Sequence, residues 1–175
     1  MAIVAALNDL GINNLIKIKW PNDILWDHKK LCGSLIEVIA ESNSSLDVII
    51  GIGLNVNSTT ANLPPSIDKP WCSLLDITGH HLDRNVLIAN LITHLNQHLQ
   101  TFIDHGFTVF QSDWHNCDYL YGASIDVSHH SGTLHGIAHG VNTDGQLILI
   151  DEMNVTHYLS SGDTSLHGMD FSEAV

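Results

Sequence analysis

Residues 15–54 constrain the fold most, because strand periodicity recurs along them with only short polar breaks. Residues 15–19 alternate apolar and polar side chains, as a half-buried strand does. Residues 24–26 and 30–40 continue as strands after polar turns. Residues 46–54 form an apolar run that is too short to span a membrane and predicts a buried central strand. The segment therefore predicts a β-sheet.

Positive charge is concentrated in the same segment. The chain has 6 Lys and Arg residues among 175 and a formal net charge of −13. Four of these cations, Lys17, Lys19, Lys29 and Lys30, lie between the first strand and the start of the third. Periodicity places Lys17 and Lys19 on one face of a strand. Such a grouping in an acidic chain indicates that the segment holds an anion.

Polar side chains follow Pro21, where the first strand is expected to end. Proline cannot donate a ladder hydrogen bond, and it biases Trp20 toward an extended conformation. The turn then presents the amide of Asn22 and the carboxylate of Asp23, which can orient a ribose or phosphate and help carry Mg²⁺. The same pair also fits an ordinary turn in which both side chains bond their own backbone.

Small residues come directly after Lys30 and Leu31. Residues 32–34 leave room for a ligand to lie close to the backbone, with Lys30 at the mouth of that space. Lys30 also fits a solvated hairpin lysine. In the later apolar run, Gly53 permits close backbone approach and Asn55 emerges at the strand end, although a single Gly-x-Gly is a weak signal.

Three motifs in this order and spacing resemble biotin protein ligases of the bacterial BirA type. They are Lys19-Trp20-Pro21-Asn22-Asp23, then Lys30-Leu31-Cys32-Gly33 with Glu37 further on, and Gly51-Ile52-Gly53-Leu54-Asn55. The resemblance extends more weakly over nearly the whole chain, as the downstream part of the catalytic domain plus the C-terminal domain. It implies a reaction in which biotin and ATP form biotinyl-5'-AMP and pyrophosphate. A lysine of a biotin carboxyl carrier protein, part of a biotin-dependent carboxylase, then takes the biotinyl group.

The resemblance also implies a role for each motif residue. It makes Lys30 the catalytic and biotin-binding lysine, and it places Gly33 and Gly53 along the biotin and adenylate cleft. It assigns nucleotide binding to Lys19, Asn22, Asp23 and Asn55. No metal site of the chain's own is expected, because Mg²⁺ comes with ATP.

One family element does not occur in these 175 residues. The Gly-Arg-Gly-Arg-x-Gly loop, which lies upstream of the Lys-Trp-Pro-Asn-Asp element in the family, is missing, and Arg84 is the only arginine. Where the family can present an arginine near the C-terminus, this chain has His167. We therefore expect a truncated ligase that is inactive alone, with a non-catalytic relative that binds nucleotide or carrier protein as the alternative. An unrelated metal-binding module is the third hypothesis.

The expected fold class is α+β. It comprises a mixed sheet with flanking helices, like class II aminoacyl-tRNA synthetases and biotin ligases but incomplete at the N-terminus, followed by a small SH3-like β-barrel. The expected domains are residues 1–116 and 117–175. Apolar spacing and capping residues predict helices over residues 1–10, 71–77, 83–106 and 107–114. Alternation predicts barrel strands over residues 123–128, 133–141, 146–150 and 156–159, with a hairpin turn at residues 143–145.

Histidine is abundant, but its spacing does not favour a metal site. His94 and His98 lie four residues apart on one predicted helix face, and His135 and His139 can share a strand face. Neither pair has a third ligand at an expected spacing. Solvated histidines are therefore the favoured interpretation.

Charge and cysteine usage exclude several classes. No Lys or Arg follows Arg84, so the second half has no basic patch for nucleic acid. The 3 widely spaced cysteines predict reduced thiols, and no signal peptide or membrane segment is visible. We therefore expect a cytoplasmic protein without a membrane partner. The resemblance also allows a homodimer formed by sheet extension.

Overall fold

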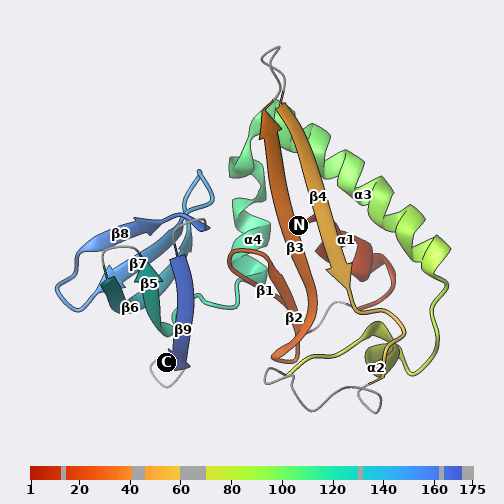
Figure 1. Cartoon of the computed structure of the whole chain (residues 1–175), viewed down its shortest axis with the longest axis horizontal. Coiled ribbons are helices and arrows are strands. Elements are labelled where there is room, and N and C mark those ends of the chain that lie inside the picture. The colour runs from red at the N-terminus through yellow and green to blue at the C-terminus, as the bar shows by residue number, and fades with distance from the viewer. Residues whose placement is uncertain (13–14, 41–45, 60–69, 130–131, 162–163, 171–175) are drawn as a thin grey trace. The chain divides into compact units, whose positions relative to one another are not determined.

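We describe a computed structural model of the chain, shown in Figure 1. The residues described are 1–12, 15–40, 46–59, 70–129, 132–161 and 164–170. Two compact units can be distinguished, and each is treated separately. One comprises Ala2–Ile18 and Asn22–His94, and the other comprises Met1, Lys19–Pro21 and Leu95–Val175. The predicted domain boundary at residues 116 and 117 stays a prediction.

A four-stranded sheet dominates the first unit, in the order β1-β2-β3-β4. Its strands are β1 (Ile16–Lys19), β2 (Asp23–Trp26), β3 (Lys29–Ala40) and β4 (Leu46–Leu54). The pairs β2–β3 and β3–β4 are antiparallel. The predicted strand segments are thus confirmed to within one residue at each end.

The position of β4 corrects one prediction. Its apolar run predicted a buried central strand, but β4 stands at the end of the strand order. Neighbouring side chains on β4 point to opposite faces of the sheet, and Val48 and Ile49 are 56% and 48% exposed. At Val48 and Ile49, both faces of β4 are therefore open in the part of the chain that the structure describes. Hydrophobicity alone predicted a strand but not its neighbours.

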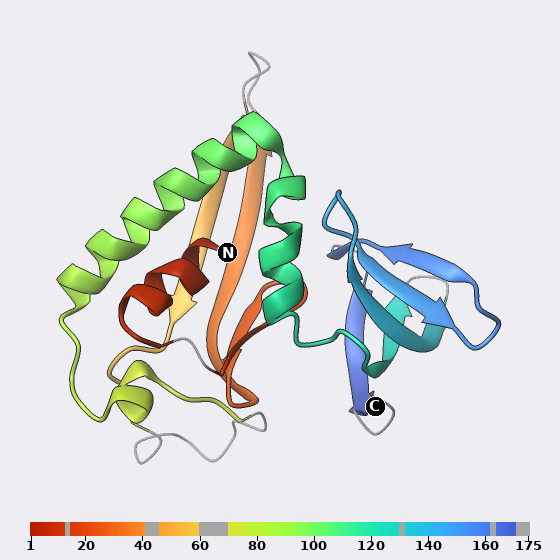
Figure 2. The ribbon, with the colours of Figure 1, turned by 180° about the vertical axis from the view of Figure 1, so that it is seen from behind.

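Helices lie on one face of this sheet, as Figure 2 shows for α1 (Ala2–Asp9) and the first half of α3 (Arg84–His105). Leu7 is fully buried on α1, and Gly11 adopts the left-handed conformation (φ 76°) just past the helix end. Asp83 accepts a hydrogen bond from the Asn85 backbone N–H at 2.8 Å. This contact confirms Asp83 as the cap of α3.

The short helix α2 (Leu74–Thr78) begins later than the predicted residue 71, because Ser73 is its N-cap. The Ser73 hydroxyl accepts from the Asp76 N–H at 3.2 Å, while the Asp76 carboxylate accepts from the Ser73 N–H at 2.9 Å. Gly79 ends the helix in the left-handed conformation (φ 74°).

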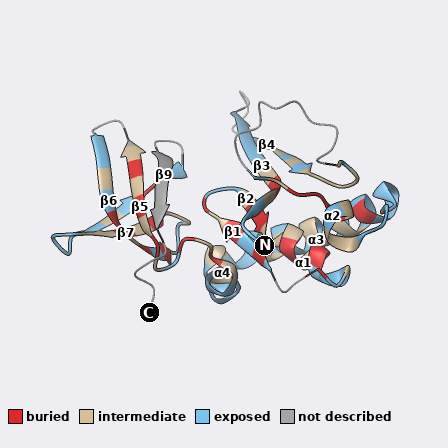
Figure 3. Cartoon of the chain, turned by 90° about the horizontal axis from the view of Figure 1, so that it is seen from below, coloured by how far each residue is buried: buried red, intermediate tan, exposed pale blue. Residues whose placement is uncertain are grey.

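The second unit carries η2 (Phe107–Phe110), α4 (Gln111–Cys117) and a five-stranded sheet of order β8-β7-β6-β5-β9. Its strands are β5 (Ser124–His129), β6 (Gly132–Val141), β7 (Leu147–Asp151), β8 (Thr156–Leu159) and β9 (Thr164–Asp170). Residues from β5, β6, β7 and β8 form its core, together with Trp20 and two residues that precede β5. Figure 3 shows buried positions on β5 and β6 in red. The core residues are Trp20, Leu120, Ala123, Ile125, Val127, Ala138, Leu147, Leu149 and Leu159.

Four of these strands confirm the sequence prediction, whereas β9 was not predicted. The α+β class is confirmed. Along the described strands, β8 pairs only with β7 and β9 only with β5. Closure into an SH3-like barrel is therefore not confirmed.

Candidate functional site

A tight hairpin brings two of the predicted site residues together. Asp27 and His28 both have positive φ angles (47° and 62°), and Trp26 pairs with Lys29 across this two-residue turn. A register shift on β2 then places Asp23 opposite Gly33. Asp23 is thus the first residue of β2, which corrects its predicted place in the turn.

The central contact of the site is an ion pair. Lys30 Nζ lies 2.6 Å from Asp23 Oδ1, and the two side chains are 45% and 28% exposed. An ion pair this open to water contributes at most about 1 kcal/mol to stability. Its ammonium group is therefore held in place while it remains accessible to another anion.

Gly33 provides the space that this ion pair occupies. A Cβ atom at Gly33 would lie 3.1 Å from Lys30 Nζ and 3.3 Å from Asp23 Oδ1. Gly53 pairs with Gly33 across β3 and β4, and a Cβ atom there would meet only the Gly33 carbonyl, at 3.6 Å. The two glycines therefore leave backbone exposed beside the Lys30 side chain.

The backbone of Lys30 is held by a segment that the sequence did not indicate. Its N–H donates to the Pro70 carbonyl at 2.9 Å, and its carbonyl accepts from the Cys72 N–H at 3.0 Å. These bonds flank an isolated parallel bridge between Lys30 and Trp71. Lys30 and Trp71 are far apart in the sequence, and a pairing of this kind produces no hydrophobic periodicity from which it could be predicted.

Asn55 ties the end of β4 to the same place. Its side-chain Nδ2 donates to the Cys72 carbonyl at 3.1 Å and to the Lys30 carbonyl at 3.4 Å. Its backbone N–H donates to the Leu31 carbonyl at 3.0 Å. Asn55 therefore positions the backbone at Lys30 directly.

Asn22 lies on the other side of Gly33 along β3. Its Nδ2 donates to the Ser34 carbonyl at 2.6 Å, and the Ser34 N–H donates back to the Asn22 carbonyl at 3.0 Å. The side chain thus bonds a neighbouring strand, rather than its own backbone as an ordinary turn would require. Its polar group is fixed next to the glycine that adjoins Lys30.

Lys19 is the predicted site residue that the structure does not place in this group. It belongs to the other compact unit, together with Trp20. Trp20 is only 4% exposed, and its indole N–H donates to the Gly145 carbonyl at 3.0 Å. Sequence reasoning gave Trp20 no role. A tryptophan within a charged motif nevertheless indicates a side chain that packs in a core.

Cys32 adjoins the site, but its thiol is not reactive. Burial, reinforced by the Asp23 charge, raises the pKa of Cys32 to about 11, although the Lys30 charge opposes this rise. A thiol with this pKa holds almost no nucleophilic thiolate at neutral pH. The chemistry available here is therefore ionic and hydrogen-bonding.

The histidines considered for metal binding have other contacts. His94 Nε2 lies 2.7 Å from Asp9 Oδ2, and the His98 ring stacks on Phe110 with centroids 5.5 Å apart. Among the described residues, no three His, Cys, Asp or Glu side chains gather in a way that could hold a metal ion. Within the same residues, no helix is long and apolar enough to cross a membrane.

Comparison with known proteins agrees with the three motifs. Residues 1–55 match the model of the biotin/lipoate A/B protein ligase family. The chain is 34% identical over 132 residues to the bifunctional ligase/repressor BirA of Bacillus spizizenii, covering 75% of this chain and 41% of the relative. It is 30% identical over 147 residues to the biotin–[acetyl-CoA-carboxylase] ligase of Mycobacterium tuberculosis, covering 83% and 51%. The chain thus spans about half the length of these curated relatives.

A solved structure supports the same assignment. The biotin protein ligase of Aquifex aeolicus in complex with biotin and ATP superposes with a TM-score of 0.79 at 26% identity, over 95% of this chain and 67% of that one. Sequence motifs, relatives and fold therefore agree that the chain is similar to biotin protein ligases.

Proposed function

We propose that this chain provides the downstream part of a biotin–protein ligase site. In that reaction biotin and ATP give biotinyl-5'-AMP, and the biotinyl group passes to a lysine of a biotin carboxyl carrier protein. One observation carries the proposal, namely that the Lys30 ammonium is accessible beside Gly33 and Gly53 while its backbone is clamped. The relatives' names give the substrate class.

The chemistry requires a fixed cation. Biotin's carboxylate and the α-phosphate of ATP repel each other, so a ligase must bring them together and stabilise the charge that develops. An ammonium group has three donors. One N–H group of Lys30 can therefore keep its contact with Asp23 while a second N–H group binds the incoming carboxylate or phosphate.

The remaining predicted residues take supporting roles in this proposal. Asn22 and Asn55 are fixed on either side of Lys30 and contribute to nucleotide binding. Nucleotide binding by Lys19 stays a prediction from the resemblance. The Asp23 carboxylate is an oxygen ligand of the kind that Mg²⁺ prefers. The ion would arrive with ATP and neutralise its phosphate oxygens.

Three further proposals concern the rest of the molecule. The C-terminal sheet is proposed to be SH3-like, with residues 1–116 and 117–175 as the two domains. Among the described strands β4 has a neighbour on one side alone, and such an edge suits a homodimer formed by sheet extension. Among the described residues, Cys32, Cys72 and Cys117 form no disulfide, which suits a reducing cytoplasm.

The 175 residues alone are proposed not to catalyse adenylation. They contain no Gly-Arg-Gly-Arg-x-Gly sequence, and their only arginine is Arg84, so the planar donors of that loop are missing. Robust pyrophosphate release from biotin and ATP by this chain would contradict this expectation. The alternative, a relative that only binds nucleotide or carrier protein, would bind ATP without needing biotin.

The ligand test uses preformed biotinyl-5'-AMP and isothermal titration calorimetry. We expect weak binding by the wild-type chain and about tenfold weaker binding by Lys30→Met, the loss typical of a charged hydrogen bond. Lys29→Met is the matched control, because it removes the same charge one residue away and should bind normally. Equal affinities for both variants, or no binding by the wild type at 1 mM ligand, would contradict the site.

A further inference from the structure

A second group of chemically active side chains lies on the C-terminal sheet. Ser124 and Asp126 are two residues apart on β5, so they share a face, and His135 of β6 pairs directly with Asp126. The intervening β5 positions, Ile125 and Val127, are buried in the core of this unit. The three polar side chains therefore stand on the face of the sheet that points away from its core.

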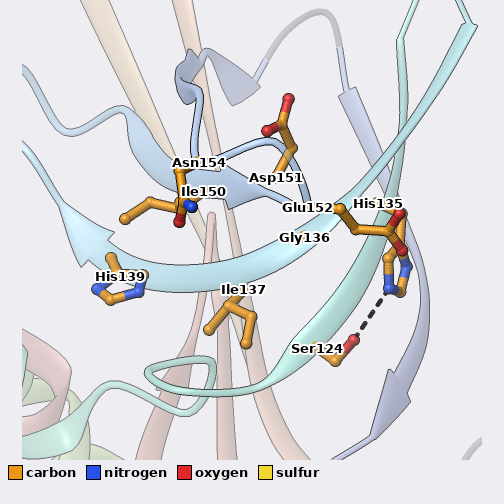
Figure 4. Close-up of a pocket in the computed structure, with 9 residues that line it drawn as sticks. All are labelled: Ser124, His135, Gly136, Ile137, His139, Ile150, Asp151, Glu152 and Asn154. Atoms are coloured by element: carbon orange, nitrogen blue, oxygen red, sulfur yellow. Dashed lines mark hydrogen bonds between the residues drawn. The ribbon is translucent and has the colours of Figure 1, made fainter.

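Their hydrogen bonds form a directed chain. His135 Nδ1 lies 2.7 Å from Asp126 Oδ1. His135 Nε2 lies 3.3 Å from the Ser124 hydroxyl oxygen, the contact drawn in Figure 4. An ionised carboxylate only accepts hydrogen bonds, so in the neutral imidazole the proton is on Nδ1 and Nε2 is the acceptor. The Ser124 hydroxyl therefore donates to Nε2. This is the order of contacts in a serine nucleophile that is activated by a histidine base.

An adjoining cavity can receive a substrate. Ser124 and His135 line a cavity of about 580 Å³, whose wall also includes the apolar side chains of Ile137 and Ile150 (Figure 4). This volume lies within the range of small-molecule sites. The wall also carries the carboxylates of Asp151 and Glu152, so it suits an uncharged ligand with a short acyl chain better than an anionic one.

We propose that Ser124 is an acyl-accepting nucleophile that hydrolyses small activated carboxylic esters. Ser124 Oγ bonds to the ester carbonyl carbon while its proton passes to His135 Nε2. The carbon–oxygen bond to the leaving alcohol then breaks, and the alcohol takes that proton from Nε2. Water repeats the sequence on the acyl-serine and releases the carboxylic acid, with Asp126 as the positioning residue that fixes the imidazole tautomer.

This activity does not depend on the ligase function. Every residue that it uses lies within Leu95–Val175. Its failure would leave the Lys30 site untouched, and the reverse also holds.

The test uses the whole 175-residue chain and 4-nitrophenyl acetate. We expect Ser124→Ala to lower the protein-dependent rate at least about tenfold, because general-base assistance contributes 10²- to 10⁴-fold in established sites and this site is open to water. Asp126→Asn should lower the rate as well, because His135 would no longer be held in the tautomer with its proton on Nδ1. Ser128→Ala is the matched control, since Ser128 lies on the same face of β5 and its hydroxyl contacts Thr133 Oγ1 at 3.2 Å. Its rate should equal that of the wild type.

A covalent readout keeps the proposal testable even where a variant fails to fold. Wild-type protein quenched during turnover, or treated with a fluorophosphonate, should carry the added group on Ser124 in peptide mass spectra. Modification elsewhere but not on Ser124, or a wild-type rate equal to that of a folded Ser124→Ala protein, would overturn the proposal.

Discussion

At the scale of single residues, the three cysteines differ in how deeply their thiols are buried. Burial raises the pKa of both Cys32 and Cys72 to about 11. At pH 8 each is therefore about 0.1% thiolate, the form that reacts. The Cys117 side chain is only partly buried.

We predict that Ellman's reagent at pH 8 modifies Cys117 first and the other two only slowly. All three should react at once in denaturant, because burial is then lost. Peptide mapping of the partly modified protein identifies the order. Fast modification of Cys32 in the folded chain would show that the strand next to Lys30 is not packed as described.

Asp151 organises the turn between β7 and β8. Its Oδ2 accepts from His157 Nε2 at 2.8 Å, and its Oδ1 accepts from the Met153 and Val155 N–H groups at 2.9 Å. The His157 hydrogen bond is the main cause of the lowered pKa of Asp151. A lowered folded-state pKa gives stability above the unfolded value of 3.8, which is lost as pH falls through the folded value.

Asp151→Asn should therefore lower the melting temperature at pH 7 and have a shrinking effect below about pH 4. Thermal unfolding followed by circular dichroism between pH 7 and pH 2.5 measures this difference. Asp144→Asn, in the exposed turn before β7, is the control and should change little at any pH. A constant deficit for Asp151→Asn across the whole range would contradict the ionic explanation.

The sequence predicted Lys30 and Asp23 as site residues but not that they pair. Their contact depends on the two-residue turn at Asp27 and His28 and on the shift in register along β2. The polar residues predicted a turn between the two strands, but not its two-residue form or the register shift, because neither turn residue is the glycine that usually signals a left-handed position. The ion pair could therefore be recognised only from the structure.

At the scale of elements, close packing of β6 against β7 leaves Gly136 the least space for a side chain among the β6 glycines. A Cβ atom at Gly136 would lie 2.9 Å from the Ile150 carbonyl carbon and 3.1 Å from the Asp151 Cα. Both are backbone atoms that cannot move independently of β7. Space for a side chain is therefore absent.

We predict that Gly136→Ala lowers the free energy of unfolding by about 2 kcal/mol or more, as overpacking does. Gly51→Ala is the matched strand control, since its nearest neighbour, the Leu35 carbonyl oxygen, lies at an ordinary 3.6 Å. Urea denaturation of both variants gives the comparison. Equal stabilities would show that β6 and β7 are less closely packed than described.

Element types were predicted better than element neighbours. Asp83 and Gly106 bracket α3 in the sequence, and the helix runs between them because capping is a local property. The edge position of β4 and the existence of β9 depend on contacts between distant segments. In β9 only scattered apolar residues occur, so alternation could not reveal the strand.

At the scale of the whole molecule, Trp20 makes a contact that local motifs did not predict. The motif that contains it was assigned to ligand binding, yet its indole ring packs in the core formed by β5 to β8. A contact across 125 residues, such as the one with Gly145, leaves no periodic trace. The similarity to biotin protein ligases was predictable because all three motifs lie within residues 19–55 and are recognised by their residues, order and spacing.

The most direct measurement of the central proposal is a map of backbone amide shifts by ¹⁵N nuclear magnetic resonance during titration with biotinyl-5'-AMP. We predict that the largest changes fall on Lys30, Gly33, Gly53 and Asn55, and that Lys30→Met abolishes them while Lys29→Met does not. Changes confined to other parts of the chain, or an identical map for both variants, would contradict the assignment of the Lys30 site.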